Sequence, residues 1–569
     1  MIITMNSFIL PPAFILIFGG LLLPWIAARF RPVLVIGLPL LTLLMVWLVT
    51  PEHSLTLHFL DYQLNILHLT ATGRVFATVF SIMACVGGLY ALKQANSMEL
   101  STAFIYAGAA IGVTFSADFL GLFIFWEIMA IASTLVLWSN VRENPRAYRA
   151  SMRYLLVHLF GGVVLMAGIA THTTATDSIA LTTLRADSIA SVLILIGFLV
   201  NAGAPPFSSW IPDAYPEASP SGSVFLSAFT TKTAVFAILM VFPGEAILIY
   251  LGLFMVFYGI IYALLENDIR RILAYSIVNQ IGFMLVAIGV GSELALNGAT
   301  AHAFVHIIYK GLLMMAAGSV LLMTGKRKCT DLGGLFQSMP VSTFAAVIGG
   351  LAVLAAPFTS GFVTKSLETS AVAKGAPAIV WFLMMAAAAA SVLHAGFKFQ
   401  WFVFFDRDSG IRTTDPSWNM RLAMWIMAAA CILIGVAPSL IYGILPYPVD
   451  YHPYSAEHIV TQIQLILFSA FAFFILLPLF RQTLSITLDF DWTYRKLLWL
   501  AIRWIKEHTP KFINPMMASI KAFGQRYFDH LFEAHGPQGF FARTWPSASM
   551  VLWVAILLAT SMILYYVKL

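Results

Sequence analysis

Residues 297–323 read NGATAHAFVHIIYKGLLMMAAGSVLLM, and this stretch decides the fold. A spanning helix needs roughly 20 mainly apolar residues, and this run is long enough to provide them. It nevertheless contains three side chains that can bind a proton, His302, His306 and Lys310. Their spacing of four residues places them on one face of a helix. The stretch therefore predicts a buried membrane helix with a row of ionisable groups along one side.

The same apolar character extends over the whole chain. Of its 569 residues, 60% are hydrophobic and only 10% are charged, and the mean hydropathy is +0.87. A soluble domain carries roughly 25% charged residues, so a large soluble domain is excluded. We expect an all-α polytopic membrane protein with about sixteen transmembrane helices. The apolar runs place them near 8–28, 33–50, 74–92, 100–118, 120–139, 151–171, 188–205, 220–242, 246–264, 271–291, 297–323, 340–372, 376–404, 417–445, 457–480 and 548–566.

The basic residues indicate the topology. Cytoplasmic loops of membrane proteins carry an excess of Lys and Arg, and here alternate loops are rich in them. We therefore expect these loops on the cytoplasmic side and both termini outside, with the first apolar run retained as a helix. The loop positive charge also explains the net charge of +6 without a nucleic-acid partner. The rich loops hold Arg29 and Arg31; Arg142, Arg146 and Arg149; Arg270 and Arg271; Lys326, Arg327 and Lys328; and Arg407 and Arg412.

Two spans contain proline within a helical run. One reads Ala204-Pro205-Pro206-Phe207, and the other Ala356-Pro357-Phe358. Proline inside a membrane helix frees backbone carbonyls, which need protein or water partners. Broken helices at matching places in two halves are typical of transport sites, although each could be an ordinary proline kink.

The polar segment 481–545 holds the densest charge in the chain. Its residues 492–506, WTYRKLLWLAIRWIK, have apolar side chains at helical spacing and basic ones opposite, which predicts an amphipathic helix at the membrane interface. We expect Pro510 and Pro515 to break this helix and a second helical piece to follow near 516–533. The final span would then anchor the segment.

Ionisable side chains inside the other spans are the main candidates for function, because a charge at the bilayer centre costs several kcal/mol. They are Glu127, Lys232, Lys365 with Glu368 three residues on, and Lys398 four residues after His394. Simpler interpretations exist for some of them. The histidines could only hydrogen-bond neighbouring helices, Lys398 could reach to the interface, and His158 could join two helices.

We expect no metal and no cofactor. The His-x-x-x-His spacing could bind a metal, but membrane di-iron enzymes need several such clusters and the sequence has one. The three cysteines, Cys85, Cys329 and Cys431, lie far apart and exclude a disulfide framework or a cysteine-based metal site. No P-loop, dinucleotide-binding glycine motif or nucleophile elbow is present.

Four stretches resemble one family. They are Phe125-Trp126-Glu127; Trp210-Ile211-Pro212-Asp213-Ala214-Tyr215 running to Lys232; residues 268–276, DIRRILAYS; and His302 through Gly318. Together they are similar to the antiporter-like proton-translocating subunits of respiratory complex I, membrane-bound hydrogenases and Mrp-type cation/proton antiporters. The resemblance covers roughly residues 70–400. Tyr215-Pro216-Glu217 and Thr231-Lys232 favour the D-type branch of the Mrp antiporter proteins.

The resemblance implies a domain organisation. Two inverted five-helix repeats, each with a broken helix, would cover 120–264 and 271–404. Transmembrane helices in 1–119 would precede them, and peripheral helices in 405–480 would follow. The segment 481–545 would be a lateral amphipathic helix that holds a neighbouring subunit, and 546–569 the last span.

The resemblance also implies roles for single residues. Glu127 matches the family's buried glutamate and Lys232 its bridging lysine, while the 302–310 row matches the central His/Lys row. Lys365 matches the lysine or glutamate of the second broken helix.

Two positions depart from the family pattern. Asn201 stands where the family has the lysine that pairs with the glutamate at Glu127, and Arg270 stands where many members have lysine. Glu127 then needs another cation, for which the sequence offers Lys232 and His158. We favour Lys232.

The function that these features favour is proton translocation, most simply in exchange for Na⁺ or K⁺, within a multisubunit complex of the bacterial inner membrane. A subunit of a redox-driven pump is an alternative, as is an energy-coupling subunit for bicarbonate uptake. A structural subunit that conducts nothing would gain little from buried charges.

Overall fold

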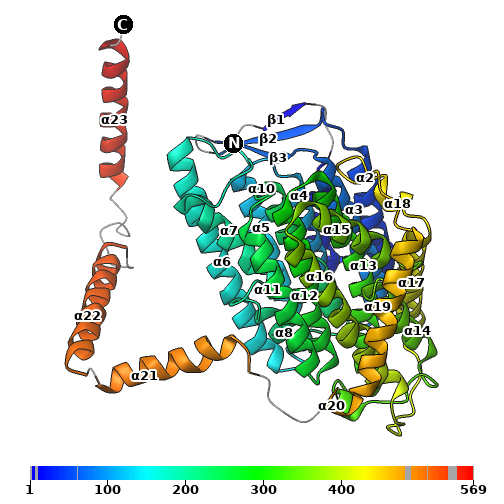
Figure 1. The fold of residues 1–569 in the computed structure, drawn as a ribbon. Coiled ribbons are helices and arrows are strands. Elements are labelled where there is room, and N and C mark those ends of the chain that lie inside the picture. The colour runs from blue at the N-terminus through cyan, green and yellow to red at the C-terminus, as the bar shows by residue number, and fades with distance from the viewer. Residues whose placement is uncertain are drawn as a thin grey trace. The chain divides into compact units, whose positions relative to one another are not determined.

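The computed structural model describes residues 3–6, 10–59, 62–480, 488–508, 510–535 and 547–567. The chain divides into two units, Met1–Asp491 and Trp492–Leu569. The first unit is a bundle of long helices with a small sheet at one end (Figure 1).

The helices of the first unit follow the apolar runs. Those up to residue 265 are α1 (Pro12–Leu22), α2 (Arg31–Leu48), α3 (Ala71–Ala91), α4 (Ser97–Phe115), α5 (Phe119–Trp138), α6 (Arg146–Thr176), α7 (Ile189–Ala202), α8 (Trp210–Ala214), α9 (Gly222–Ala228), α10 (Thr230–Val241) and α11 (Ile247–Leu265). Those after it are α12 (Ile269–Val290), α13 (Glu293–Thr324), α14 (Pro340–Val353), α15 (Ser360–Gly375), α16 (Ala378–Ser391), α17 (Trp418–Val436), α18 (Ser439–Tyr442), α19 (Ala456–Ile475) and α20 (Leu477–Phe480).

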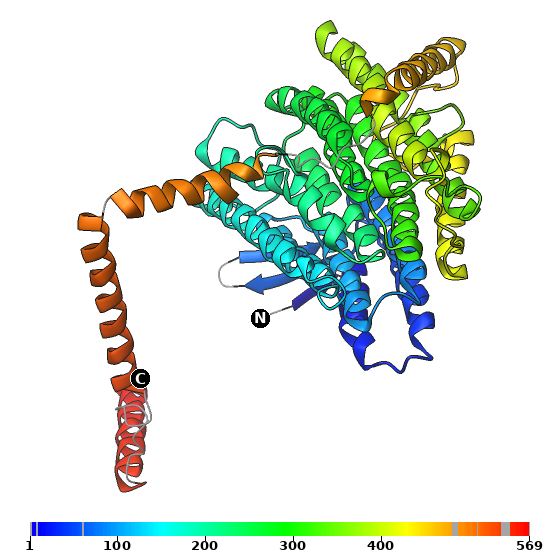
Figure 2. The same cartoon turned by 90° about the horizontal axis from the view of Figure 1, so that it is seen from below.

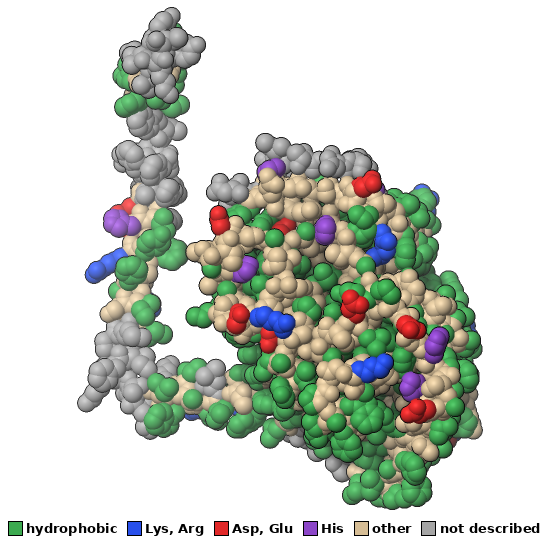
Figure 3. Space-filling view, turned by 45° about the horizontal axis from the view of Figure 1, so that its top comes forward, with side chains coloured by type: hydrophobic (Ala, Val, Ile, Leu, Met, Phe, Trp, Pro, Cys, Tyr) green, Lys and Arg blue, Asp and Glu red, His purple; other side chains and the backbone are tan. Residues whose placement is uncertain are grey.

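The lengths of these helices fit a multi-pass membrane protein. Among the described residues, twelve helical stretches are long and apolar enough to cross a bilayer, and four shorter apolar helices accompany them. Each of them overlaps one of the sixteen apolar runs of the sequence. The flank of the bundle is covered by hydrophobic side chains, while charged side chains gather at its sheet-bearing end (Figure 3). Because α12 is buried along its whole length, it forms the centre of the bundle.

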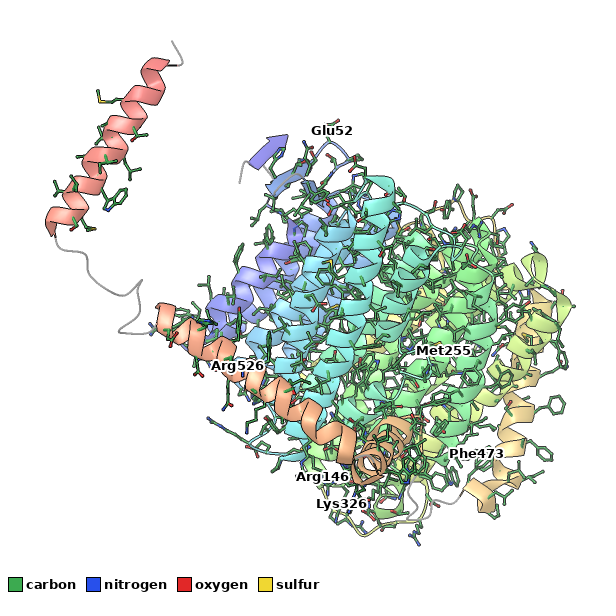
Figure 4. The ribbon with its side chains drawn as sticks, turned by 90° about the vertical axis from the view of Figure 1, so that its left-hand side faces the viewer. Glu52, Arg146, Met255, Lys326, Phe473 and Arg526 are labelled. Carbon is green, nitrogen blue, oxygen red and sulfur yellow. The ribbon has the colours of Figure 1, made fainter. Side chains whose placement is uncertain are left out.

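Two of the predicted basic loops lie at the same end of the bundle. Arg146 and Lys326 are at this end, which we call the basic end, and Glu52 is at the opposite end (Figure 4). Figure 2 looks at the bundle from the basic end. These two loops therefore share one side, as the Lys and Arg pattern predicts, and the assignment of that side to the cytoplasm stays a prediction.

Both predicted helix breaks are present. The first separates α7 from α8, and the second separates α14 from α15. The chain turns in the left-handed region at each one, at Gly203 (φ 75°) and Ala355 (φ 56°). A further break, which the sequence analysis did not predict, lies at Phe229 between α9 and α10. Two π-helical turns, Val392–Lys398 and Trp401–Phe405, also follow α16.

Two segments of the bundle share one order of elements. Asp118 caps α5 by accepting from the Gly121 N–H, and Asp268 caps α12 by accepting from the Arg270 N–H. A helix of about thirty residues follows each of them, α6 after α5 and α13 after α12. The chain that leaves this long helix forms a β-bridge with the capping aspartate, Ala180 with Asp118 and Lys328 with Asp268. A broken helix comes next in both.

A three-stranded antiparallel sheet departs from the all-α prediction. Strand β2 (Ser54–Phe59) pairs with β1 (Ile3–Asn6) and with β3 (Tyr62–Leu67). Apolar and polar residues alternate from 54 to 59, between two of the predicted spans, and alternation with a period of two is typical of a strand with one buried face.

The second unit contains a π-helical turn (Thr493–Leu497), α21 (Leu498–His508), α22 (Pro510–His535) and α23 (Ser547–Val567). The amphipathic helix near 492–506 is confirmed. The predicted break at Pro510 is present, because α21 ends at His508 and α22 begins at Pro510, whereas the predicted break at Pro515 is wrong, because α22 runs through it. The predicted lateral segment, 481–545, also includes residues 481–487, 509 and 536–545, which lie outside the described residues.

Candidate functional site

His302, on α13, lies at the centre of a fully buried hydrogen-bonded cluster. Its Nδ1 is 2.8 Å from Glu368 Oε2 on α15. Its Nε2 is 3.0 Å from the Tyr309 hydroxyl and 3.2 Å from Gln280 Oε1 on α12. All four side chains have essentially no solvent exposure. The histidine can therefore pass a proton between a carboxylate and a phenol without water entering.

His306 and Lys310 extend this cluster along the same helix face. The ring of His306 is 6.2 Å from that of His302, and neither of its nitrogens has a hydrogen-bond partner in the described part of the chain. Lys310 Nζ donates to Ser276 Oγ at 2.8 Å. His306 also lies within electrostatic range of Lys232, Lys310 and Lys365. The row inferred from four-residue spacing is therefore brought together with the two other buried lysines.

Lys232 lies beside the break between α9 and α10. Its Nζ donates to the Ser227 carbonyl at 2.7 Å and to Thr231 Oγ1 at 3.1 Å. The break at Phe229 interrupts the helical ladder and leaves the carbonyls at the end of α9 in need of donors. Lys232 supplies one while staying fully buried.

Both proline-containing breaks are closed by a side chain from the following helix. Lys365 Nζ donates to the Val353 carbonyl at 2.8 Å, at the end of α14. Trp210 Nε1 donates to the Val200 carbonyl at 3.0 Å, at the end of α7. Asp213, at the end of α8, forms a two-bond ion pair with Arg153 on α6. A titratable donor therefore closes the second break and a non-titratable donor closes the first.

Glu127 has no partner of the predicted kind. Its Oε1 has no hydrogen-bond partner among the described residues, and Lys232 donates to other atoms. The favoured direct pair of Glu127 with Lys232 is therefore absent from this structure. The reason is packing: the glutamate carboxyl lies against Gly162 on α6, where a methyl group would come within 2.1 Å of it.

Two further polar side chains, His158 and Asn201, lie beside the Gly161–Gly162 pair. His158 is four residues before Gly162 on α6, is 1% exposed, and has no described partner for its Nε2. Its Nδ1 is held by the Tyr154 carbonyl at 2.9 Å. Asn201 is fully buried, and neither amide atom has a described partner. The first half of the bundle, the segment before α12, therefore brings together buried polar atoms that have no hydrogen-bond partner among the described residues.

Three further residues named in the sequence analysis, Arg270, His394 and Lys398, lie on α12 and on the π-helical turn after α16. Arg270 donates to the carbonyls of Pro216, Ala218 and Ser219, so it holds the loop after α8. Lys398 is fully buried and donates to the carbonyls of Ala263, Leu264 and Glu266 at the end of α11. The ammonium of Lys398 is therefore paired inside the bundle and does not reach solvent. His394 is fully buried, with no described partner for either nitrogen, and lies within electrostatic range of Lys310 and Lys398.

Two cavities approach the buried row. One, of about 730 Å³, is lined at the basic end by Glu99, Glu143, Ser221 and Arg327 among others. The other, of about 330 Å³, is lined by Lys365, Ser370 and the first turn of α19. Because α14 leads away from the basic end and α15 lies toward the sheet-bearing end (Figure 1), this second cavity lies toward the end of the bundle opposite the basic end.

Several buried polar residues escaped the sequence analysis. Glu99 lies in the first turn of α4 and is 2% exposed. Asp489, just before the second unit, accepts hydrogen bonds from the hydroxyls of Tyr258 and Tyr275, and Tyr258 in turn accepts from Ser208 in the first break. An acidic residue in a first turn resembles an ordinary helix cap, and Asp489 stands in a polar stretch, so neither had a distinguishing signal. Within the described residues no group of three His, Cys, Asp or Glu side chains could hold a metal ion.

Residues 116–394 match the family described as NADH:quinone oxidoreductase/Mrp antiporter, transmembrane part. Among curated proteins, the chain is 26% identical over 423 residues to a Na(+)/H(+) antiporter subunit A1 of Staphylococcus haemolyticus, covering 66% of this chain and 53% of that protein. It is 28% identical over 341 residues to a subunit A1 of Staphylococcus aureus, covering 53% of this chain and 42% of that one. The chain thus spans about half the length of the curated relatives it matches.

Solved structures share the fold. The chain superposes on a chain of the Mrp complex from Dietzia sp. DQ12-45-1b with a TM-score of 0.68 at 18% identity, covering 80% of this chain and 98% of that one. A chain of respiratory complex I from Thermus thermophilus gives 0.68 at 19% identity, with 80% and 99% coverage. A chain of an archaeal membrane-bound sulfane sulfur reductase gives 0.66 at 22% identity, with 80% and 97% coverage.

Proposed function

We propose that this chain, an antiporter-like membrane protein of the complex I and Mrp family, moves protons across the membrane as one subunit of a larger complex. The observation that carries the proposal is the buried row of His302, His306 and Lys310 together with the two buried lysines Lys232 and Lys365. From here on, the row means these five residues, which join the two halves of the bundle. Burying so many proton-binding groups away from water costs free energy, and such residues in membrane proteins usually have a function.

The proposed path runs along this row. Two ammonium groups in a low-dielectric interior repel each other. A proton that arrives on Lys232 therefore favours the departure of a proton from Lys310. His302 and Glu368 would accept it, and Lys365 would release it toward the cavity beside α19. No single group needs to move far.

The proposed architecture consists of two inverted five-helix repeats, 120–264 and 271–404. The matching aspartate caps, return bridges and broken helices of the two segments support it. An odd number of spans in each repeat would place the two in opposite directions across the membrane.

We propose His158 as the group that serves Glu127 where Asn201 replaces the family's lysine. Both His158 and the carboxyl of Glu127 lie along the Gly162 side of α6, and both have open hydrogen-bonding capacity. Because the Tyr154 carbonyl holds Nδ1, the His158 Nε2 is the atom that can accept a proton.

The exchanged ion and the partners belong to the same proposal. The relatives named as Na(+)/H(+) antiporter subunits favour Na⁺/H⁺ exchange in a Mrp-type complex of the bacterial inner membrane, with both termini outside. Those relatives bear the name subunit A1, whereas Tyr215-Pro216-Glu217 and Thr231-Lys232 favour the D-type branch. The matches to respiratory complexes support a redox-driven pump as the second candidate, because they fit the fold equally well.

Replacing Lys232 tests the proposal. Everted vesicles from cells that carry the whole complex would be energised, and a pH-sensitive dye would report proton release on adding Na⁺ or K⁺. We expect Lys232→Ala to abolish the response at normal expression, and Lys93→Ala, a partly exposed lysine outside the row, to leave it unchanged. Wild-type vesicles that respond to an electron donor but to neither cation would favour the redox pump. Near-normal exchange by Lys232→Ala would contradict the proposal.

A further inference from the structure

A buried carboxylate lies at the cavity of the basic end. Glu99 is only 2% exposed, yet it lines the cavity of about 730 Å³. Its Oε1 accepts a hydrogen bond from the hydroxyl of Ser221. The hydroxyls of Ser139 and Ser219 also contact it, and the guanidinium of Arg270 lies within electrostatic range. The carboxylate is thus held by hydroxyl groups at the boundary between the cavity and the protein interior.

The other two acidic side chains of the cavity are placed differently. Glu143 is exposed to solvent. Glu217 forms an ion pair with Arg327 and accepts from the side-chain amide of Asn144. Neither therefore combines burial with freedom from a basic partner at ion-pair distance, as Glu99 does within the described residues.

A short helix links Glu99 to Lys232. Ser221, which donates to Glu99, immediately precedes α9. At the other end of α9, the Ser227 carbonyl accepts from Lys232 Nζ. Seven helical residues span about 10 Å at 1.5 Å per residue. The carboxylate in the cavity and the first lysine of the row are therefore separated by about one short helix.

A second line of hydroxyls runs beside this helix. Tyr106 is seven residues after Glu99 and so lies on the same face of α4. Its hydroxyl is 2.5 Å from Thr230 Oγ1 and accepts from the Thr230 N–H at 2.9 Å. Thr230 precedes Thr231, whose hydroxyl accepts from Lys232. A hydroxyl can donate and accept at once, so Tyr106 and Thr230 form one hydrogen-bonded step between α4 and the residues next to Lys232.

We infer that Glu99 is the proton-relay group through which the cavity at the basic end exchanges protons with Lys232. The inference rests on the proposed function and adds to it the point of entry. In each transfer, the Glu99 carboxyl gives its proton toward neutral Lys232, which becomes an ammonium. The carboxylate left behind takes a proton from water in the cavity, so charge and protons balance.

Glu99→Gln tests the relay, because it keeps the shape and loses the proton. In the vesicle assay with the whole complex, we expect exchange to fall about 100-fold, the usual size of a proton-transfer contribution. Glu99→Asp should restore at least a tenth of the wild-type rate, because it restores a titratable carboxylate. Glu143→Gln is the matched control from the same cavity and should stay within about twofold of wild type. Assembly would be checked by co-purification of the complex.

Side-specific labelling gives a second readout that does not depend on transport. Glu99→Cys would be made with Cys85 and Cys431 replaced by Ala. Burial raises the pKa of the Cys329 thiol to about 12, so this native cysteine stays protonated and unreactive near neutral pH. A small membrane-impermeant thiosulfonate should label Glu99→Cys from the basic end and not from the other side.

The outcomes separate the relay from the function beneath it. Loss in Lys232→Ala with normal exchange in Glu99→Gln would overturn the relay and leave the proposed function standing. No exchange by the wild-type complex would overturn both. If Glu99→Gln does not assemble, exchange below a tenth of wild type in an assembled Glu99→Asp, or labelling of Glu99→Cys only from the far side, would overturn the relay.

Discussion

The two broken-helix regions differ in how completely their polar groups are paired. In the second half, His302 is bonded to Glu368, Tyr309 and Gln280, and Lys365 closes the break at Val353. In the first half, Glu127 Oε1, His158 Nε2 and both amide atoms of Asn201 have no partner among the described residues. His302 is thus paired at both ring nitrogens, although the nitrogens of His306 and His394 in the same half have no described partner, whereas Glu127 Oε1 and Asn201 in the first half are unpaired.

This difference separates two ways of keeping polar groups in a membrane. A fully bonded network is rigid, and losing one member leaves its neighbours unsatisfied. An open set costs stability but can accept protons or water as they arrive. In the second half, the bonded groups near Lys310 are therefore suited to hold a proton in a fixed position. In the first half, the unpaired groups are suited to take up and release protons on the way to Lys232.

Breaking the closed pair should have the largest effect. Glu368→Gln removes the charge that faces His302 and leaves the histidine and Lys365 without it. Removing one member of a buried pair typically costs about 3–5 kcal/mol. We expect exchange to be lost and the melting temperature of the purified complex to fall. In a double-mutant cycle, His302→Gln with Glu368→Gln should be less harmful than the sum of the two; additive losses would show that the two residues act separately.

Sequence patterns found the row but not its partners. Four-residue spacing placed His302, His306 and Lys310 on one face, and proline located both main breaks. The pairing of His302 with Glu368 depends on how α13 packs against α15, which is set by tertiary contacts that single-helix periodicity does not contain. The break at Phe229 has no proline, and Glu99 resembles a common helix-capping acid, so neither had a local signal.

A single methyl group should perturb the open region next most strongly. At Gly162 an added Cβ would lie 2.1 Å from Glu127 Oε1, the end of a flexible side chain, so the carboxyl must move. We expect Gly162→Ala to lower exchange about tenfold or more, within the range for a displaced proton-transfer group. Stability should change little. Gly37→Ala is the matched control, because nothing lies within 4 Å of its added Cβ.

A cycle with His158 identifies the partner of Glu127. If His158 serves it, then Glu127→Gln and His158→Gln together should be no worse than the stronger single change. Losses that multiply would show that Glu127 and His158 act separately, and would rule out His158 as the partner of Glu127.

Replacing Lys398 should show the effect of losing a lysine that stabilises the fold but does not transfer protons. It supplies hydrogens to three carbonyls at the end of α11, so Lys398→Met leaves buried acceptors unsatisfied. Such a loss costs about 1–3 kcal/mol. We expect a lower melting temperature with exchange per assembled complex within about threefold of wild type, since proton transfer does not pass through it. Exchange that falls as far as in Lys232→Ala would place Lys398 in the path.

Asp489 offers the smallest and most selective perturbation, because it joins the open region to the chain that leads into the second unit. Its carboxylate accepts from Tyr258 and Tyr275, and Tyr258 accepts from Ser208 beside the first break. Asp489→Asn keeps the shape but weakens two charge-assisted bonds, a loss of about 1–2 kcal/mol. We expect protease cleavage between 481 and 498 to become faster while the bundle stays folded and Lys232-dependent exchange persists at a reduced rate.

Deleting 492–566 should leave the same bundle intact but loosen its hold on partner subunits, as expected of an amphipathic segment with its own final span. A truncated chain that keeps all its partners would show that residues 492–566 do not serve assembly. An Asp489→Asn variant with unchanged cleavage and exchange would show that Asp489 does not stabilise the first break.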